Sequence, residues 1–136
     1  MFKTVLFPID QSREAREAAE VVVDIVQKYD SHLVLLSVVE IADSEASADA
    51  EPMASPDQVA QLLQNAQSLF TQQGIQAETI EREGKPAFVI CDVADEIGAN
   101  LIVMGCRGLG LTEEGMTDSV TNRVINLSPC PVLVVP

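Results

Sequence analysis

The chain has 136 residues, of which 47% are hydrophobic and 21% charged, which suits one globular domain over residues 1–136 rather than a disordered chain. Its net charge of −13, with only 8 dispersed lysines and arginines, argues against binding to nucleic acid and against docking on anionic membranes. No apolar run approaches the roughly 20 residues of a membrane span, and no charged start precedes an apolar segment. We therefore expect a soluble, cytoplasmic protein.

The N-terminal part of the chain predicts two strands with a helix between them. Residues 3–9 are apolar and β-prone, with Pro8 near the end of the strand. Residues 12–30 repeat apolar side chains at helical spacing, and Asp10 precedes them as a candidate N-cap. Residues 33–39 form a nearly continuous apolar run, which is typical of a strand buried on both faces.

The middle of the chain begins with an acidic segment. Residues 40–56 are rich in Ala, Ser, Asp, Glu and Pro and lack a repeating apolar face, which predicts a mobile loop. Ser55-Pro56-Asp57-Gln58 has the residues of a helix start, and this helix is predicted to end at Gly74. Its inward stripe is expected to be Val59, Leu62, Leu63, Ala66, Leu69 and Phe70. Residues 75–80 alternate between apolar and polar, as in a strand at the edge of a sheet.

The C-terminal part predicts two more helices and two more strands. Gly84-Lys85-Pro86 opens a helix that ends at Gly98, and residues 101–104 form the next strand. A last helix ends before Pro129, and residues 132–135 form the final strand. The residues of the last helix expected to face inward are Val120, Val124 and Leu127.

The alternation of strands and helices predicts an α/β fold with a five-stranded, mostly parallel sheet and helices on both faces. Right-handed crossovers leave few topologies, and we expect the strand order 3-2-1-4-5. Ligands of such sheets bind beyond the carboxyl ends of the strands, at the switch point between the first and fourth strands. Asp10 follows the first strand and Gly105 the fourth, so we expect these two residues to lie close together.

The segment after the fourth strand has the composition of a phosphate-binding loop. Residues 105–117 contain four glycines, and nine residues separate Gly105-Cys106-Arg107-Gly108 from Asp118-Ser119 at the start of the last helix. Glycines let backbone N–H groups approach a phosphate closely, and a helix N-terminus adds free donors and a positive dipole. The alternative interpretation is a flexible connection.

The cysteines and the histidine carry weaker signals. Cys91, Cys106 and Cys130 are widely spaced and form no zinc pattern, so we expect no metal site. Cys91 and Cys130 are expected to pack in or near the core, whereas Cys106 lies in the glycine loop. His32 is expected at the surface, with no carboxylate partner visible in the sequence.

Several of these segments together resemble the universal stress protein family. The resemblance covers nearly the whole chain and is carried by Val5–Ser12, Gly84-Lys85-Pro86, residues 101–108 and residues 119–135. It implies a Rossmann-like domain, similar to the adenine nucleotide alpha hydrolases, that binds ATP or AMP, with Mg²⁺ as a further candidate. It also implies a homodimer through the C-terminal strand.

The resemblance implies roles for individual residues. Gly105 and Gly108 would lie against the phosphates and ribose, and Ser119 would donate its hydroxyl and N–H to phosphate. Asp10 would lie near the ribose or adenine, and Val39 near the adenine. The complete candidate set is Pro8, Asp10, Val39, Gly105, Arg107, Gly108, Asp118, Ser119 and Val120.

One position departs from the family pattern. Nucleotide-binding members carry Gly-x-x-Gly, nine residues, and then Gly-Ser or Gly-Thr, whereas here Asp118 replaces the second motif's glycine. Its carboxylate repels a phosphate by several kcal/mol at ~4 Å where water is scarce. Glu113 and Glu114 add to this repulsion, Arg107 opposes it, and Mg²⁺ could bridge the groups. The alternative is that Asp118 only neighbours the helix cap.

Two functions from different classes stay open. The first is regulatory adenine-nucleotide binding in the stress response, through a degenerate phosphate loop and coupled to an unidentified protein partner. The second is a nucleotide-free homodimeric interaction module, favoured by Asp118 and by residues 132–135, an apolar edge strand that a second copy could cover. An enzyme that cleaves adenosine phosphates is least favoured, because no general base or nucleophile has a supporting partner.

Overall fold

The structure is a computed structural model, and it describes residues 2–9, 14–40, 56–105 and 120–135. The elements in chain order are β1 (Thr4–Pro8), α1 (Glu14–Tyr29), β2 (His32–Glu40), α2 (Pro56–Gln72), β3 (Ala77–Gly84), α3 (Pro86–Ile97), β4 (Leu101–Gly105), α5 (Val120–Leu127) and β5 (Val132–Val135). The predicted alternation of strands and helices is confirmed. The predicted acidic loop and the glycine loop lie outside the described residues, apart from their end residues Glu40, Pro56 and Gly105.

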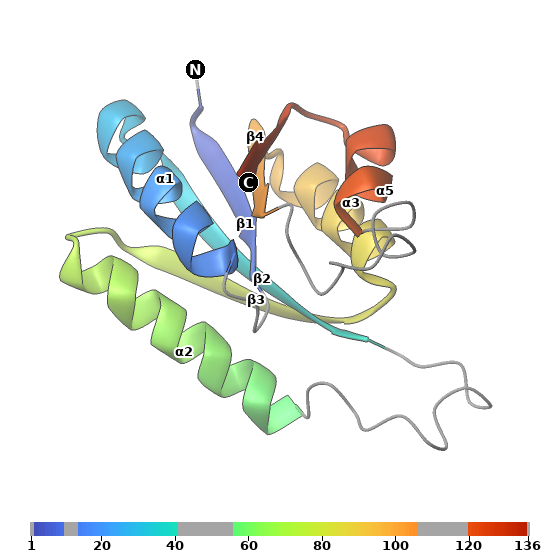
Figure 1. Cartoon of the computed structure of the whole chain (residues 1–136), viewed down its shortest axis with the longest axis horizontal. Coiled ribbons are helices and arrows are strands. Elements are labelled where there is room, and N and C mark those ends of the chain that lie inside the picture. The colour runs from blue at the N-terminus through green and yellow to red at the C-terminus, as the bar shows by residue number, and fades with distance from the viewer. Residues whose placement is uncertain (1, 10–13, 41–55, 106–119, 136) are drawn as a thin grey trace.

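The strands form one sheet in the order β3-β2-β1-β4-β5, as predicted. Every neighbouring pair is parallel, so the sheet is wholly rather than mostly parallel. Figure 1 shows α1 and α2 on one side of the sheet and α3 and α5 on the other. Because all strands run the same way, their carboxyl ends lie along one edge.

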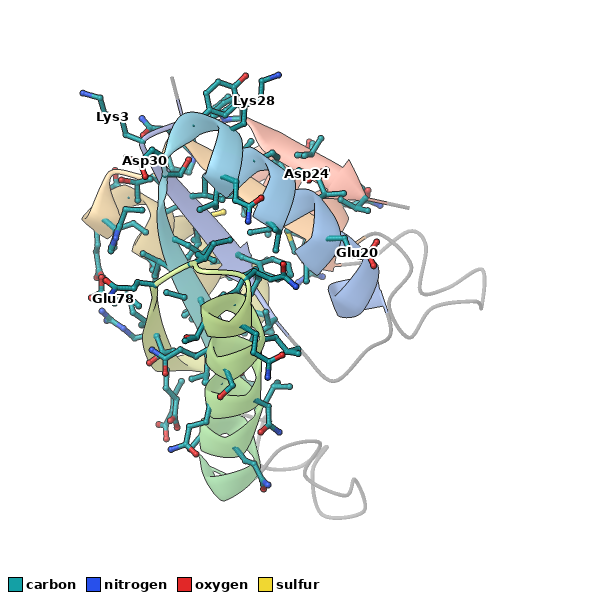
Figure 2. All side chains as sticks on the ribbon, turned by 90° about the vertical axis from the view of Figure 1, so that its left-hand side faces the viewer. Lys3, Glu20, Asp24, Lys28, Asp30 and Glu78 are labelled. Carbon is teal, nitrogen blue, oxygen red and sulfur yellow. The ribbon has the colours of Figure 1, made fainter. Side chains whose placement is uncertain are left out.

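Each face of the sheet carries its own core. Val5 and Phe7 of β1 pack on the α1 and α2 side, and Leu6 between them packs on the α3 and α5 side. This alternation follows from the two-residue period of a strand. Phe7 also meets Phe70 of α2 edge to face, with ring centroids 6.1 Å apart, which fixes α2 against the centre of the sheet. The charged residues stay outside: Glu20 and Asp24 lie on the outward side of α1 (Figure 2).

The third strand differs most from its predicted limits. It was expected over residues 75–80, but β3 begins at Ala77 and continues to Gly84. It is paired with β2 throughout, from Leu33↔Ala77 to Glu40↔Gly84. Backbone bonding to a long neighbouring strand therefore outweighs the weak strand propensity of the charged residues at its end. Its place at the edge of the sheet is confirmed.

Two helical residues predicted to face inward are exposed instead. Leu69 of α2 is 56% exposed and Leu127 of α5 is 49% exposed, whereas Phe70 and Val124 of the same helices are buried. A helix that lies on a sheet buries a narrow stripe, so residues at the margin of an apolar pattern remain in water. The end of α3 at Gly98 is confirmed, since this glycine has the left-handed φ of 64° that closes a helix.

Candidate functional site

The predicted switch point lies between two adjacent strands, β1 and β4. β1 ends at Pro8 and β4 ends at Gly105, at the same edge of the sheet. Val39 lies one residue before the end of β2, on the other side of β1. The fold therefore places three predicted site residues on the carboxyl ends of three neighbouring strands.

Of the other predicted site residues, the structure describes one. Val120 is the first residue of α5, and its backbone is described. The others lie outside the described residues, and their roles stay predictions: Asp10, Arg107, Gly108, Asp118 and Ser119.

Backbone hydrogen bonds show which way each residue of β1 faces. The carbonyl oxygen of Lys3 accepts from the His32 N–H at 2.7 Å, and the Ile9 N–H donates to the carbonyl oxygen of Leu36 at 2.8 Å. Both bonds run to β2. The backbone N–H and C=O of Thr4 instead bond to the side chain and the N–H of Asn100, just before β4. Odd-numbered residues of β1 thus bond towards β2 and even-numbered residues towards β4.

The two neighbours of β1 are paired with it over different lengths. Among the described strand residues, β1 and β2 are in register from Thr4↔His32 to Pro8↔Leu36. The register between β1 and β4 comprises only Val5↔Leu101 and Leu6↔Ile102. The ladder between β1 and β4 therefore ends where it would need an N–H from Pro8, while the two strands remain neighbours in the sheet. Sequence reasoning missed Asn100, whose side chain anchors the amino end of this ladder.

Val39 offers an apolar surface near this point. Its side chain is half-buried and packs against the core on the α1 and α2 side. Its partner in the register with β3 is Glu83, next to Gly84 at the end of that strand. A branched apolar side chain of this kind can pack against a planar, uncharged ring.

Comparison with known proteins identifies the family. The sequence model of the universal stress protein family matches residues 1–136. The universal stress protein Sll1654 of Synechocystis sp. is 64% identical over 136 residues, which are 100% of this chain and 87% of that protein. The chain belongs to the universal stress protein family.

Solved structures agree with this family fold. The hypothetical protein MJ0577 is 26% identical to this universal stress protein, with a TM-score of 0.82 over 99% of this chain and 96% of that one. A universal stress protein solved in complex with cAMP is 25% identical, with a TM-score of 0.79 over 99% of this chain and 97% of that one.

Outside the switch point, the described residues of this universal stress protein offer little chemistry. A shallow hollow of about 150 Å³ lies between β3 and α3, lined by Arg82, Glu83, Val89, Asp92, Val93 and Glu96. It contains none of the predicted site residues, and an exposed ion pair of 2.9 Å between Arg82 and Glu96 spans it. The described residues hold no cluster of three metal-ligating side chains, and none of the described helices is long and apolar enough to cross a membrane.

The thiols and the histidine also lie away from the switch point. Cys91 and Cys130 pack at the margin of the core beside α3 and α5, as predicted, and burial raises the pKa of both thiols. Cys106 lies outside the described residues. His32 lies at the surface, as predicted, and its Nε2 is 2.9 Å from Oε2 of Glu78, a partner that is not visible in the sequence. The pairing of β2 with β3 brings them together across 46 residues, so the sequence gives no local sign of it.

Proposed function

We propose that this protein is a regulatory domain that binds an adenine nucleotide in the cytoplasm during the stress response. The observation that carries the proposal is the adjacency of Pro8 and Gly105 at the switch point of a parallel sheet, where α/β proteins bind their ligands. The cAMP complex of a family member with the same fold supports it.

In this proposal the nucleotide lies across the carboxyl ends of β2, β1 and β4. Val39 contacts the adenine, and Asp10 bonds to the ribose or the base. Gly105 and Gly108 let the backbone approach the phosphates, and Ser119 and Val120 at the start of the last helix donate to them. Arg107 is the cation within this glycine loop. ATP and AMP are the candidate ligands; if Mg²⁺ accompanies the nucleotide, the Asp118 carboxylate would help to hold it and it would offset the phosphate charge.

Substitution of Asp118 tests this arrangement. Binding of ATP and AMP is measured by calorimetry for the natural chain, Asp118→Gly and Asp118→Asn. In buffer without Mg²⁺, removal of the charge should strengthen ATP binding about tenfold, equivalent to ~1.4 kcal/mol. AMP should gain less because it carries fewer phosphate charges. The asparagine variant keeps the Cβ, so it separates charge from crowding. Equal ATP affinity in all three chains would contradict a phosphate beside residue 118.

A second candidate function is a homodimeric interaction module, and the two edges of the sheet favour it. The edge strand β3 carries exposed charges at Glu78, Glu81 and Glu83, which discourage pairing with another chain. The edge strand β5 consists of valines and Leu133, which is 36% exposed, and carries no charge. A second copy paired along β5 would cover this edge and could present a joint surface to a further protein partner.

A further inference from the structure

Two cysteines from different parts of the chain lie against the same core. Cys91 belongs to α3 and Cys130 to the short segment between α5 and β5, and both are half-buried against the cluster that contains Ile102. The Ile102 N–H donates to the carbonyl oxygen of Pro131 at 3.0 Å, which fixes the residue after Cys130 beside β4. Neither cysteine belongs to the proposed nucleotide site, so the proposed function gives them no role.

Cys91 lies on the side of α3 that is turned towards α5. The opposite side of this helix, which includes Val89, lines the hollow beside β3. Between the two sides runs the buried stripe, and Cys91 borders it because Ala87 and Ala94 lie one helical turn before and after it. α3 packs against α5 (Figure 1), and the segment that carries Cys130 continues from α5.

The two thiols also interact electrostatically. Burial is the main cause of the raised pKa of Cys91, and the charges of Asp92 and Cys130 raise it further. Because a charge acts on a neighbour more weakly with distance, this effect agrees with thiols that lie close together. Burial raises the pKa of Cys130 too, but the hydrogen bond from the Ser128 hydroxyl, 3.8 Å from the sulfur, opposes that rise. Cys130 is therefore the thiol better placed to react first.

We propose that Cys91 and Cys130 form a reversible disulfide that joins α3 to the segment before β5 when the protein meets a peroxide. The Cys130 thiolate attacks one oxygen of hydrogen peroxide, which gives a sulfenic acid and releases hydroxide. The Cys91 thiolate then attacks the sulfenic sulfur, and the S–S bond forms as that oxygen leaves as a second hydroxide. With two protons taken up, two thiols and one hydrogen peroxide give one disulfide and two waters. A dithiol reductant reverses the bond by thiol–disulfide exchange.

The test compares four chains after treatment with hydrogen peroxide: the natural chain, Cys91→Ser, Cys130→Ser and Cys106→Ser. The last is the matched control, because it removes the third cysteine of the chain and leaves this pair in place. Mass spectrometry gives the mass of each intact chain and the linked peptides of a digest without reduction. Dimedone traps any sulfenic acid, and thermal unfolding is followed with and without dithiothreitol.

We expect the natural chain and Cys106→Ser each to lose two hydrogens and to yield one linked peptide pair, between Cys91 and Cys130. The bond closes a loop of about 40 residues and should raise Tm by about 5–10 °C, a rise that dithiothreitol removes. In Cys91→Ser, dimedone should label Cys130, since the thiol that resolves the sulfenic acid is gone.

Three results would overturn the proposal. The first is a link from Cys91 or Cys130 to Cys106, and the second is oxidation of Cys91 and Cys130 to separate sulfinic acids in the natural chain. The third is a linked chain with a lower Tm than the reduced one, because the bond would then strain the fold rather than fit it.

Discussion

Single residues control how β1 is joined to its neighbours. Asn100 receives the Thr4 N–H on its side chain at 2.9 Å and donates its own N–H to the Thr4 carbonyl at 2.8 Å, so β1 and β4 are fastened at their amino ends. Pro8 has no donor to offer β4 at the other end. The ladder between these two strands is thus anchored by Asn100 at one end and lacks one donor at the other.

Gly84 is a second residue whose identity the fold requires. Its φ of +144° is unfavourable for any residue with a Cβ, and a Cβ here would lie 2.7 Å from Cγ2 of Val89. We expect Gly84→Ala to lower the free energy of unfolding by about 2 kcal/mol or more, from backbone strain and crowding together. Urea denaturation measures the change.

Gly98→Ala is the matched control for that substitution. Gly98 also has a positive φ, of +64°, but a Cβ there would meet nothing within 4 Å. Its cost should be that of the left-handed conformation alone, about 1 kcal/mol. Equal losses of stability in the two variants would show that the contact with Val89 does not matter.

The two described cysteines should react slowly. Burial raises the pKa of Cys91 and Cys130 above the ordinary 9.0, and the charge of Asp92 raises that of Cys91 further. A raised pKa means less thiolate at a given pH, so alkylation of both at pH 8 should be slower in the folded than in the unfolded chain. Mass spectrometry of iodoacetamide-treated peptides measures each rate.

Asp92→Asn separates the effect of the Asp92 charge on Cys91 from that of burial. Removal of the charge should speed alkylation of Cys91 and leave Cys130 unchanged, because Asp92 does not raise the pKa of Cys130. Folded-state rates that match the unfolded chain would be incompatible with buried thiols at these positions.

At the scale of elements, the sequence predicted the type and order of the helices and strands better than their first and last residues. Alternating strands and helices with right-handed crossovers leave few topologies, and the order expected among them, β3-β2-β1-β4-β5, is confirmed. The end of β3 at Gly84 could not be predicted, because its charged residues are held through their backbone by β2. Leu69 was misassigned because its exposure depends on how α2 is seated on the sheet.

The position of the candidate site could also be predicted only in part. The switch-point rule predicts that residues after the first and fourth strands meet, and Pro8 and Gly105 do lie on adjacent strands. The interrupted pairing between these strands could not be predicted. It depends on which neighbour the Pro8 nitrogen faces, and only the bonds of Lys3, Thr4 and Ile9 establish that.

The contrast between the edge strands predicts the oligomeric state. We expect a homodimer paired along β5, and Val134→Lys should convert it to a monomer by placing a charge in the interface. Thr79→Lys is the matched control, because Thr79 is exposed on β3 at the opposite edge. Analytical ultracentrifugation distinguishes the states, and a monomeric natural chain at micromolar concentration would contradict the prediction.

At the scale of the whole molecule, the net charge affects the stability of the expected dimer. Each copy carries a net charge of −13, so two copies repel each other, and added salt screens the repulsion. Figure 2 shows Glu20 and Asp24 on the outward side of α1, where they add to this negative surface. Dimerisation should therefore strengthen as ionic strength rises, and sedimentation at low and high salt would detect the shift.

The central claim is that an adenine nucleotide binds at the carboxyl ends of β2, β1 and β4. The most direct test is a titration of the natural chain with AMP, followed through the backbone amide signals in NMR. We predict saturable shifts at Ile9, Val39, Gly105 and Val120, with none at His32 or at the other residues of the opposite edge. No shift at any concentration, or shifts centred on the hollow between β3 and α3, would contradict the account.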